Sequence, residues 1–223
     1  MAAAIERHSG QSVRVVAASR ADWLLTNWSL GWRRLLDRSA ALVEELAALA
    51  PAGRIHLVGH SSGGVMLRLL LGDEPFAGRV YGLRARVQTL LTLGSPHRAL
   101  RGTALRQLVD RRYPGAFHAP GVRYVAVAGA IDPEQLRPRA RGLCQRSYQA
   151  INGDPASRGD GLVPLSSALL AGAESLVLEG VGHGGWFAES WYGSEAVLPR
   201  WIDQLPAAAS AAAPQADRAA EGA

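Results

Sequence analysis

The amino-acid sequence predicts an α/β fold with a doubly wound, mainly parallel sheet. Short apolar runs that suit buried strands alternate five times with stretches that suit helices, and this alternation is typical of a parallel sheet. Residues 87–93 (VQTLLTL) are apolar almost throughout, as expected of a strand covered on both faces. A chain of 223 residues is long enough for one domain with a substantial core, which we expect over residues 1–205.

Five runs predict strands because they are short and rich in β-branched or other apolar residues. The last four are each followed directly by a glycine, which marks a turn at the end of the strand. The expected strands are residues 13–18, 55–58, 87–93, 122–128 and 175–179.

Five stretches predict helices. In the first, apolar residues recur at spacings of three and four until Pro51 and Gly53 end the pattern. The expected helices are residues 30–50, 65–72, 103–110, 166–171 and 195–204. The third lies in a polar, arginine-rich insertion, residues 98–120, which is a candidate for a small lid. Residues 132–159 form a long excursion, and the Ala- and Pro-rich residues 206–223 predict a disordered tail.

The most informative motif joins the second strand to the helix after it. Gly59-His60-Ser61-Ser62-Gly63 matches G-x-S-x-G, in which a serine nucleophile occupies a sharp, strained turn. We expect Gly59 and Gly63 to relieve the crowding around Ser61. The following helix points its positive N-terminal end toward Ser61, and the backbone N–H of Ser62 is the expected oxyanion donor.

Two further polar residues complete a catalytic triad. A serine hydroxyl needs a base to accept its proton, and the base needs an acid to orient it. Asp160 and His183 follow Ser61 in the chain, each beside glycines, and Asp160 comes after the fourth strand and His183 after the fifth. Ligands of parallel sheets bind at the carboxyl ends of the strands, so we expect the three residues to meet there.

Other residues are open alternatives. Asp132 also follows the fourth strand and is the second candidate for the acid. His60 and His97 could join His183 in a metal site, but no H-x-H or H-x-x-H spacing supports one, so we expect no metal. The candidates for the substrate pocket are His60, His97, Trp186 and Phe187, with Trp191 and Tyr192 nearby. The alternative for each of them is ordinary packing.

Composition narrows the class of partner. The net charge is +5 and all 24 basic residues are arginines, but they are scattered rather than gathered on one face, so we expect no nucleic acid. Weak association with an anionic membrane surface stays open. The single cysteine, Cys144, excludes an internal disulfide, and we find neither a signal peptide nor a long apolar run. We therefore expect a cytoplasmic protein.

Four segments together resemble the lipase-like α/β-hydrolases. They are LVGHSSGG at residues 57–64, LTLGSPH at residues 91–97, GDGLVP at residues 159–164 and VGH at residues 181–183. The resemblance covers about residues 10–205 and is closest to the groups of glycosylphosphatidylinositol deacylase-like and lecithin–cholesterol acyltransferase-like serine hydrolases. The Asp22-Trp23-Leu24 loop is similar to that of bacterial and plastid members.

The resemblance implies an α/β-hydrolase domain with Ser61 as nucleophile, Asp160 as acid and His183 as base. It also implies hydrolysis of a carboxylic or lipid ester through an acyl-enzyme, without a cofactor. The chain departs from the family at its start, because the N-terminal strands and the H-G loop that donates the second oxyanion N–H are lacking. We expect that Met1 is an internal methionine. The alternative is that strand 13–18 pairs directly with strand 55–58.

Three functions follow from this reading. The first is a serine esterase or lipase. The second is an acyltransferase on the same scaffold, in which an alcohol replaces water as the acceptor. The third is a non-catalytic lipid-binding protein that has kept the triad but has lost the oxyanion loop.

Overall fold

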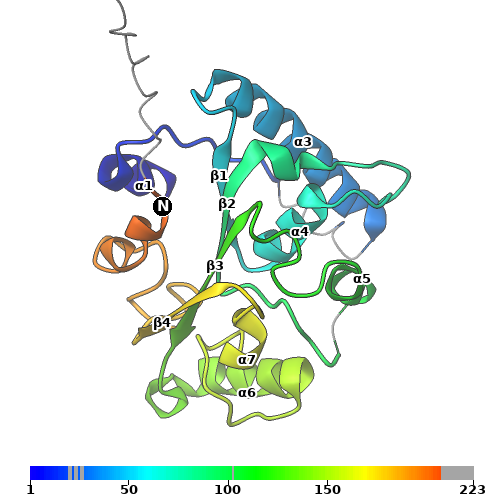
Figure 1. Ribbon diagram of the computed structural model, residues 1–223. Coiled ribbons are helices and arrows are strands. Elements are labelled where there is room, and N and C mark those ends of the chain that lie inside the picture. The colour runs from blue at the N-terminus through cyan, green and yellow to red at the C-terminus, as the bar shows by residue number, and fades with distance from the viewer. Residues whose placement is uncertain (20–21, 23–24, 26–27, 102, 207–223) are drawn as a thin grey trace, which may run out of the picture.

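The computed structural model describes residues 1–19, 22, 25, 28–101 and 103–206 (Figure 1). Most of the tryptophan-containing loop that precedes the first long helix lies outside these residues. The tail expected to be disordered lies outside them too, from residue 207 onward.

A parallel sheet forms the centre of the molecule, and the predicted α/β class is confirmed. Its strands are β1 (Ile55–His60), β2 (Val87–Leu93), β3 (Arg123–Ala130) and β4 (Glu174–Glu179). They lie in the order β1-β2-β3-β4, and every neighbouring pair is parallel. Among the described residues β1 pairs only with β2, so the strand that leads to Ser61 is one edge of the sheet.

The strand predicted for residues 13–18 is wrong. This segment forms no ladder, and Val15 is 70% exposed. The backbone N–H of Val13 instead donates to the Glu6 carboxylate at 2.7 Å, and Arg38 donates to the carbonyl of Ala17 at 2.9 Å. The β-branched residues give the segment local strand propensity, but only Val13 packs against the core, and tertiary context decides the outcome. Direct pairing of this segment with β1 is therefore excluded.

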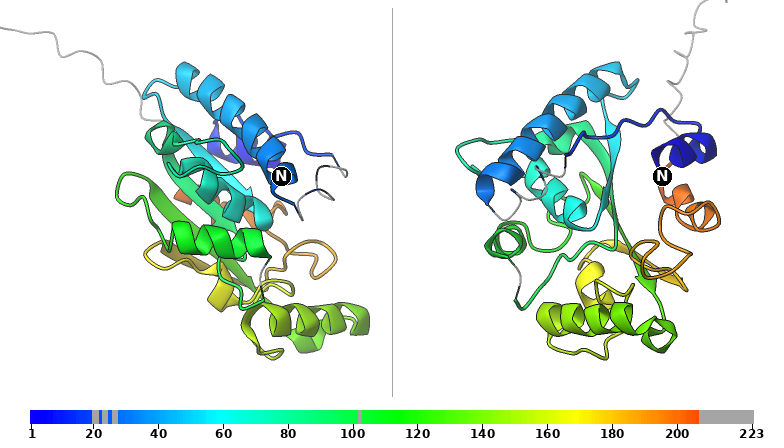
Figure 2. Two further views of the ribbon diagram at one scale, coloured as in Figure 1. Left: turned by 90° about the vertical axis from the view of Figure 1, so that its right-hand side faces the viewer. Right: turned by 180° about the vertical axis from the view of Figure 1, so that it is seen from behind.

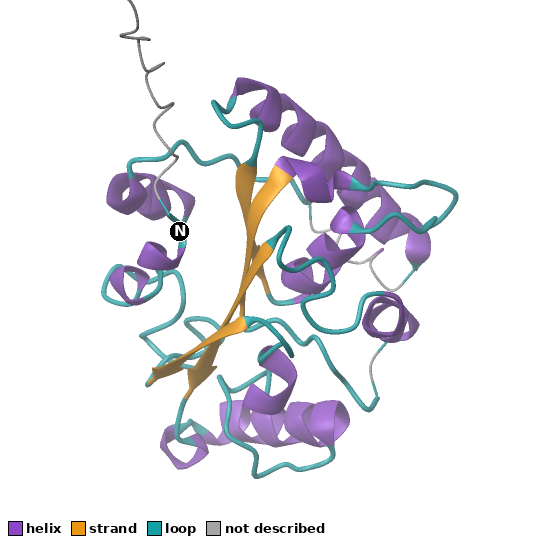
Figure 3. Ribbon diagram, in the orientation of Figure 1, coloured by secondary structure: helices purple, strands orange, loops and turns teal. Residues whose placement is uncertain are grey.

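Helices surround the sheet (Figure 3). The α-helices are α1 (Ala2–Ser9), α3 (Ser29–Leu49), α4 (Ser62–Leu71), α5 (Ala104–Arg112), α6 (Pro138–Asn152) and α7 (Leu165–Ala168). Short 3-10 helices are η2 (Leu83–Arg86), η3 (Pro133–Gln135), η4 (Leu198–Arg200) and η5 (Ile202–Gln204). In Figures 1 and 2, α3, α4 and α5 cover one face of the sheet, α1 with η4 and η5 covers the other, and α6 and α7 lie beside β4.

Two helix predictions need correction. The helix expected over residues 195–204 is two short 3-10 turns, η4 and η5, because Pro199 lacks the N–H that a continuing α-helix requires. The excursion after β3 contains an unpredicted α-helix, α6. It begins with Pro138 in its first turn and ends at Gly153, whose φ of 82° is a left-handed C-cap.

The core is divided by the sheet. Adjacent residues of β2 point to opposite faces, so Leu90 packs with α3 and α4 whereas Leu91 packs with α1 and the C-terminal turns. Both leucines are fully buried. The two central strands, β2 and β3, are thus covered on both faces, whereas β4 is mostly exposed.

Candidate active site

The turn between β1 and α4 holds Ser61 in a strained conformation. Its φ of 56° and ψ of −133° lie in a region that residues with a side chain rarely adopt. The backbone N–H of Ser61 donates to the carbonyl of Leu93 at the end of β2, at 2.9 Å, which fixes the turn to the sheet. The side chain is half-buried and stands at the N-terminus of α4.

The glycines of this turn have different roles from those predicted. A Cβ at Gly59 would lie 2.5 Å from the Cα of Gly64, and one at Gly64 would lie 2.1 Å from the hydroxyl oxygen of Ser95. A Cβ at Gly63 would meet nothing within 4 Å. The close approach that the turn requires is therefore between β1 and the second glycine of α4, and the role expected of Gly63 is wrong.

The three residues predicted as a triad lie in hydrogen-bond contact. His183 Nε2 is 3.0 Å from Ser61 Oγ, and His183 Nδ1 is 2.9 Å from Asp160 Oδ2. We call this chain of contacts the Ser61–His183–Asp160 relay. His183 and Asp160 are buried, so the contacts act in a region of low dielectric constant.

The Asp160 carboxylate is held by donors on both oxygens. Oδ1 accepts from the backbone N–H groups of Leu162 and Val163 at 3.0 and 2.8 Å. Oδ2 accepts from His183 and from the hydroxyl of Tyr192, the latter at 2.8 Å. The buried carboxyl group thus has a hydrogen-bond partner on each oxygen, which offsets the cost of removing it from water.

Tyr192 belongs to this site, although the sequence indicated only that it could line a pocket. Its hydroxyl accepts from the backbone N–H of Gly129 at 2.7 Å while it donates to Asp160. Burial and the Asp160 charge raise the pKa of Tyr192 well above its usual value, so the phenol stays a donor. Gly94, with φ +53°, makes room, because a Cβ there would lie 2.4 Å from Asp160 Oδ2.

His60 supports the other side of His183. Its ring centroid lies 4.7 Å from that of His183, and its Nε2–H donates to the His183 backbone carbonyl at 3.0 Å. Burial, followed by the neighbouring His183, lowers the pKa of His60 to about 4, so the ring is neutral near pH 7. His60 therefore holds the loop of His183 through a hydrogen bond rather than through charge.

The other pocket candidates are His97, which is buried in the core, and the packed pair Trp186 and Phe187. His97 is fully buried, with its Nδ1 3.4 Å from Arg68 Nη1 and its Nε2 3.1 Å from Thr92 Oγ1. It is therefore a packing residue and does not line a substrate pocket. Trp186 is 50% exposed and packs edge-to-face on Phe187. Phe187 covers the turn of Asp160, because a Cβ at Gly161 would lie 2.5 Å from its ring.

The second candidate for the acid lies outside the relay. Asp132 is exposed, and its Oδ1 accepts from the backbone N–H of Glu134 at 2.9 Å, which caps η3. The Asp132 carboxylate thus serves as the N-cap of a short surface helix. Asp160 is thus the acid that the fold brings to His183.

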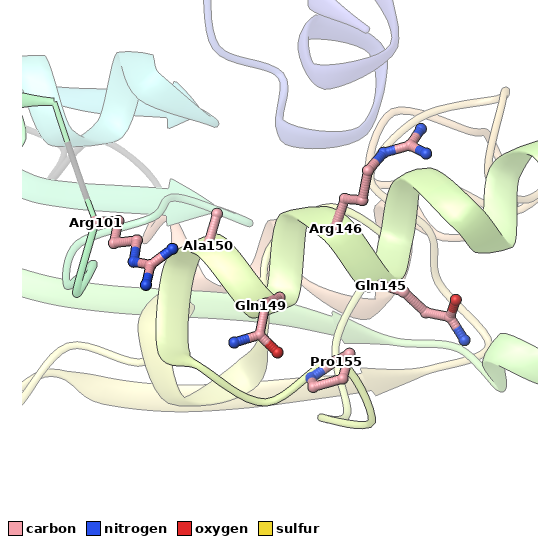
Figure 4. A pocket seen from close by; sticks show the side chains of 6 residues that line it. All are labelled: Arg101, Gln145, Arg146, Gln149, Ala150 and Pro155. Carbon is pink, nitrogen blue, oxygen red and sulfur yellow. The ribbon is translucent and has the colours of Figure 1, made fainter.

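Two surface cavities lie away from the relay. One, of about 360 Å³, lies on α6, the loop after it and the segment before α5 (Figure 4), and it is lined by Arg101, Gln145, Arg146, Gln149, Ala150 and Pro155. The other, of about 430 Å³, lies beyond the ends of β3 and β4 and includes Asp132. Within the described ranges no three His, Cys, Asp or Glu side chains gather as metal ligands.

Comparison with models of known protein families gives no match, and comparison with curated proteins gives no significant match either. In the part of the chain that the structure describes, no helix combines the length and apolarity needed to cross a bilayer. Over the residues that it describes, the structure establishes an α/β fold with a four-stranded parallel sheet.

Proposed function

We propose that the protein is a serine hydrolase that cleaves carboxylic or lipid esters through an acyl-enzyme. The observation that carries the proposal is the Ser61–His183–Asp160 relay at the carboxyl end of a parallel sheet. Each residue comes from a different loop, and the nucleophile has the backbone strain expected of G-x-S-x-G serines. The resemblance to lipase-like α/β-hydrolases supports the same reaction.

In the proposed reaction, Ser61 Oγ attacks the ester carbonyl while His183 Nε2 accepts its proton. Asp160 keeps the proton of His183 on Nδ1 and stabilises the imidazolium that forms. The backbone N–H of Ser62, at the positive end of α4, donates to the developing oxyanion. His183 then protonates the leaving alcohol, and water attacks the acyl-enzyme with the same residue as base.

The test is hydrolysis of short- and medium-chain p-nitrophenyl esters by the wild-type protein and by Ser61→Ala. We expect turnover by the wild type and a loss of about 10³-fold or more in the variant, because the nucleophile is removed. A fluorophosphonate probe should label the wild type and not Ser61→Ala. Equal hydrolysis by both proteins would refute the proposal.

The product separates hydrolysis from acyl transfer. With a competing alcohol present, a hydrolase releases mainly the free acid, whereas an acyltransferase releases mainly the new ester. Folded protein that neither turns over esters nor reacts with the probe would favour the lipid-binding alternative.

A further inference from the structure

Beside the nucleophile stands an arginine with an uncommon environment. Arg106 lies in the first turns of α5, within the insertion of residues 98–120, and is half-buried. Its Nη2 is 3.1 Å from Oγ of Ser62, the residue that follows Ser61. The insertion thus brings a guanidinium to the immediate neighbourhood of the relay.

No carboxylate of the described residues lies within 4.0 Å of the Arg106 guanidinium. The natural partner is Asp110, one helical turn later, since residues four apart lie on the same helix face. Asp110 instead lies 4.0 Å from the buried Arg68. Arg112, on the same helix, shows the usual pattern, because it pairs with Glu74 at 3.0 Å.

A partly desolvated cation beside a neutral hydroxyl is costly unless an anion joins it. Burial lowers the pKa of Arg106, yet a guanidinium stays charged in proteins. The group has five N–H donors in a fixed fork that matches a carboxylate or a phosphate in two parallel bonds. The contact with Ser62 leaves most of these donors for such a ligand.

We propose that Arg106 is a specificity-determining residue that binds an anionic group, a carboxylate or a phosphate, on the ester substrate close to the scissile carbonyl. This inference rests on the proposed function, because it deepens the choice of substrate at the same site. The preferred substrates are acidic esters rather than neutral ones, and Arg106 acts on the ground-state binding of their charge.

The test compares mono-p-nitrophenyl glutarate, which carries a free carboxylate on the acyl side, with its neutral methyl ester. A second pair places the charge on the leaving group: 3-carboxy-4-nitrophenyl butyrate against p-nitrophenyl butyrate. The wild type should prefer the anionic member of at least one pair in kcat/KM. In Arg106→Gln that preference should fall by about tenfold to a hundredfold, the effect of losing a charge-assisted contact.

Two control variants separate recognition from folding. Arg111 is exposed on the same helix, so Arg111→Gln should keep the wild-type preference. Arg106→Lys keeps the positive charge but not the planar set of donors, so it should retain part of the preference for anionic esters. Equal losses on neutral and anionic esters in Arg106→Gln, a gain on both, or an unchanged preference would each overturn the proposal.

A binding measurement keeps the two proposals distinguishable. Calorimetric titration of Ser61→Ala with monomethyl glutarate requires no turnover. The affinity for monomethyl glutarate should be lower by about tenfold or more in Ser61→Ala/Arg106→Gln than in Ser61→Ala. If the wild type hydrolyses no ester, the proposed reaction has failed while the titration still decides whether Arg106 binds the anion. Equal affinities in the two variants would refute the role of Arg106.

Discussion

At the scale of single residues, Asp160 shows how the fold supplies a buried carboxylate with hydrogen-bond donors. Its four donors come from its own turn, from His183 and from Tyr192. Tyr192 comes from a segment that follows the His183 loop in the chain, and it is fully buried. It also satisfies the backbone N–H of Gly129, so it connects the acid to the middle of the sheet.

Tyr192→Phe should weaken both stability and catalysis. The variant leaves the buried N–H of Gly129 without its acceptor and removes one donor from Asp160, at a cost of about 1–3 kcal/mol in unfolding free energy. We expect kcat to fall several-fold with little change in KM, because Tyr192 is fully buried behind Asp160. Denaturant unfolding and steady-state kinetics on p-nitrophenyl esters measure the two effects.

The control is Tyr81→Phe, which removes a hydroxyl that donates to Asp37 at 2.8 Å on the surface of α3. It should lower stability without lowering kcat. If Tyr192→Phe also leaves kcat unchanged, Tyr192 has no part in positioning Asp160.

The stability of the fold should decrease below neutral pH, partly because of His60. Its pKa is lowered to about 4 in the folded state, from an ordinary value near 6.5, mainly by burial. Between these two values the unfolded chain binds the proton and the folded chain does not, so unfolding free energy falls as the pH falls. The slope for one such proton is at most about 1.4 kcal/mol per pH unit.

His60→Gln should therefore flatten the dependence of unfolding free energy on pH between about 6.5 and 4. Glutamine keeps an N–H donor for the His183 carbonyl and does not titrate. Urea unfolding at pH 7, 6 and 5 measures the slopes. Parallel slopes for the two proteins would contradict the lowered pKa of His60.

At the scale of elements, the turn between β1 and α4 depends on two of its three glycines. Gly59→Ala should destabilise the fold by about 3 kcal/mol or more and abolish ester hydrolysis, because the new Cβ meets backbone atoms of α4 that cannot move independently. Gly63→Ala should leave the unfolding free energy almost unchanged or raise it by up to about 1 kcal/mol. The new Cβ meets no other atom, and alanine is a better helix former than glycine at this position of α4. Thermal unfolding of both variants checks the contrast, and similar losses would disprove it.

The sequence predicted best the strands whose apolar composition and closing glycine mark their limits. The strands of residues 87–93 and 175–179 were placed to within one residue, because β2 and β4 are apolar runs closed by glycine. Residues 13–18 are also rich in β-branched residues but are held by Glu6 and Arg38, which no local pattern reveals. Helix α6 was missed even though its buried residues recur at helical spacing, at Ala140, Cys144, Tyr148 and Ile151. Only one of these is a large aliphatic residue, and the arginines and glutamines between them make the stretch polar.

The candidate site divides in a similar way. Ser61, Asp160 and His183 were predicted because glycines and strand ends mark each of them in the sequence. Tyr192 and Arg106 carry no such mark, since their role depends on which loops the fold brings together. Gly94 is the sequence feature that comes nearest to indicating the role of Tyr192. Because glycine has no Cβ, Asp160 and Tyr192 can pack against it.

At the scale of the whole molecule, the beginning and the end of the described chain form one layer. Ala4 and Ile5 of α1 are buried against Trp201 and Ile202 of the C-terminal turns, on the face of the sheet opposite α3. This layer covers Leu91 and Val127 of the two central strands. The short helix α1 is thus part of the core rather than an appendage.

Ile5→Ala should lower the unfolding free energy by about 2–5 kcal/mol, the usual cost of emptying a buried isoleucine site. Val15→Ala is the matched control, because Val15 is exposed in the following segment and should change stability by no more than about 0.5 kcal/mol. Chemical denaturation measures both. An equally small effect at Ile5 would mean that α1 does not contribute to the core in solution.

The strand order has a consequence for how activity is lost. Ser61 follows β1 and His183 follows β4, so the proposed nucleophile and its base are attached to the two outermost strands of the sheet. Outer strands exchange their amide protons and open more readily than inner ones. On warming, ester hydrolysis should therefore disappear at a lower temperature than the far-ultraviolet circular dichroism signal, because fraying at either side separates Ser61 from His183 while β2 and β3 are still folded.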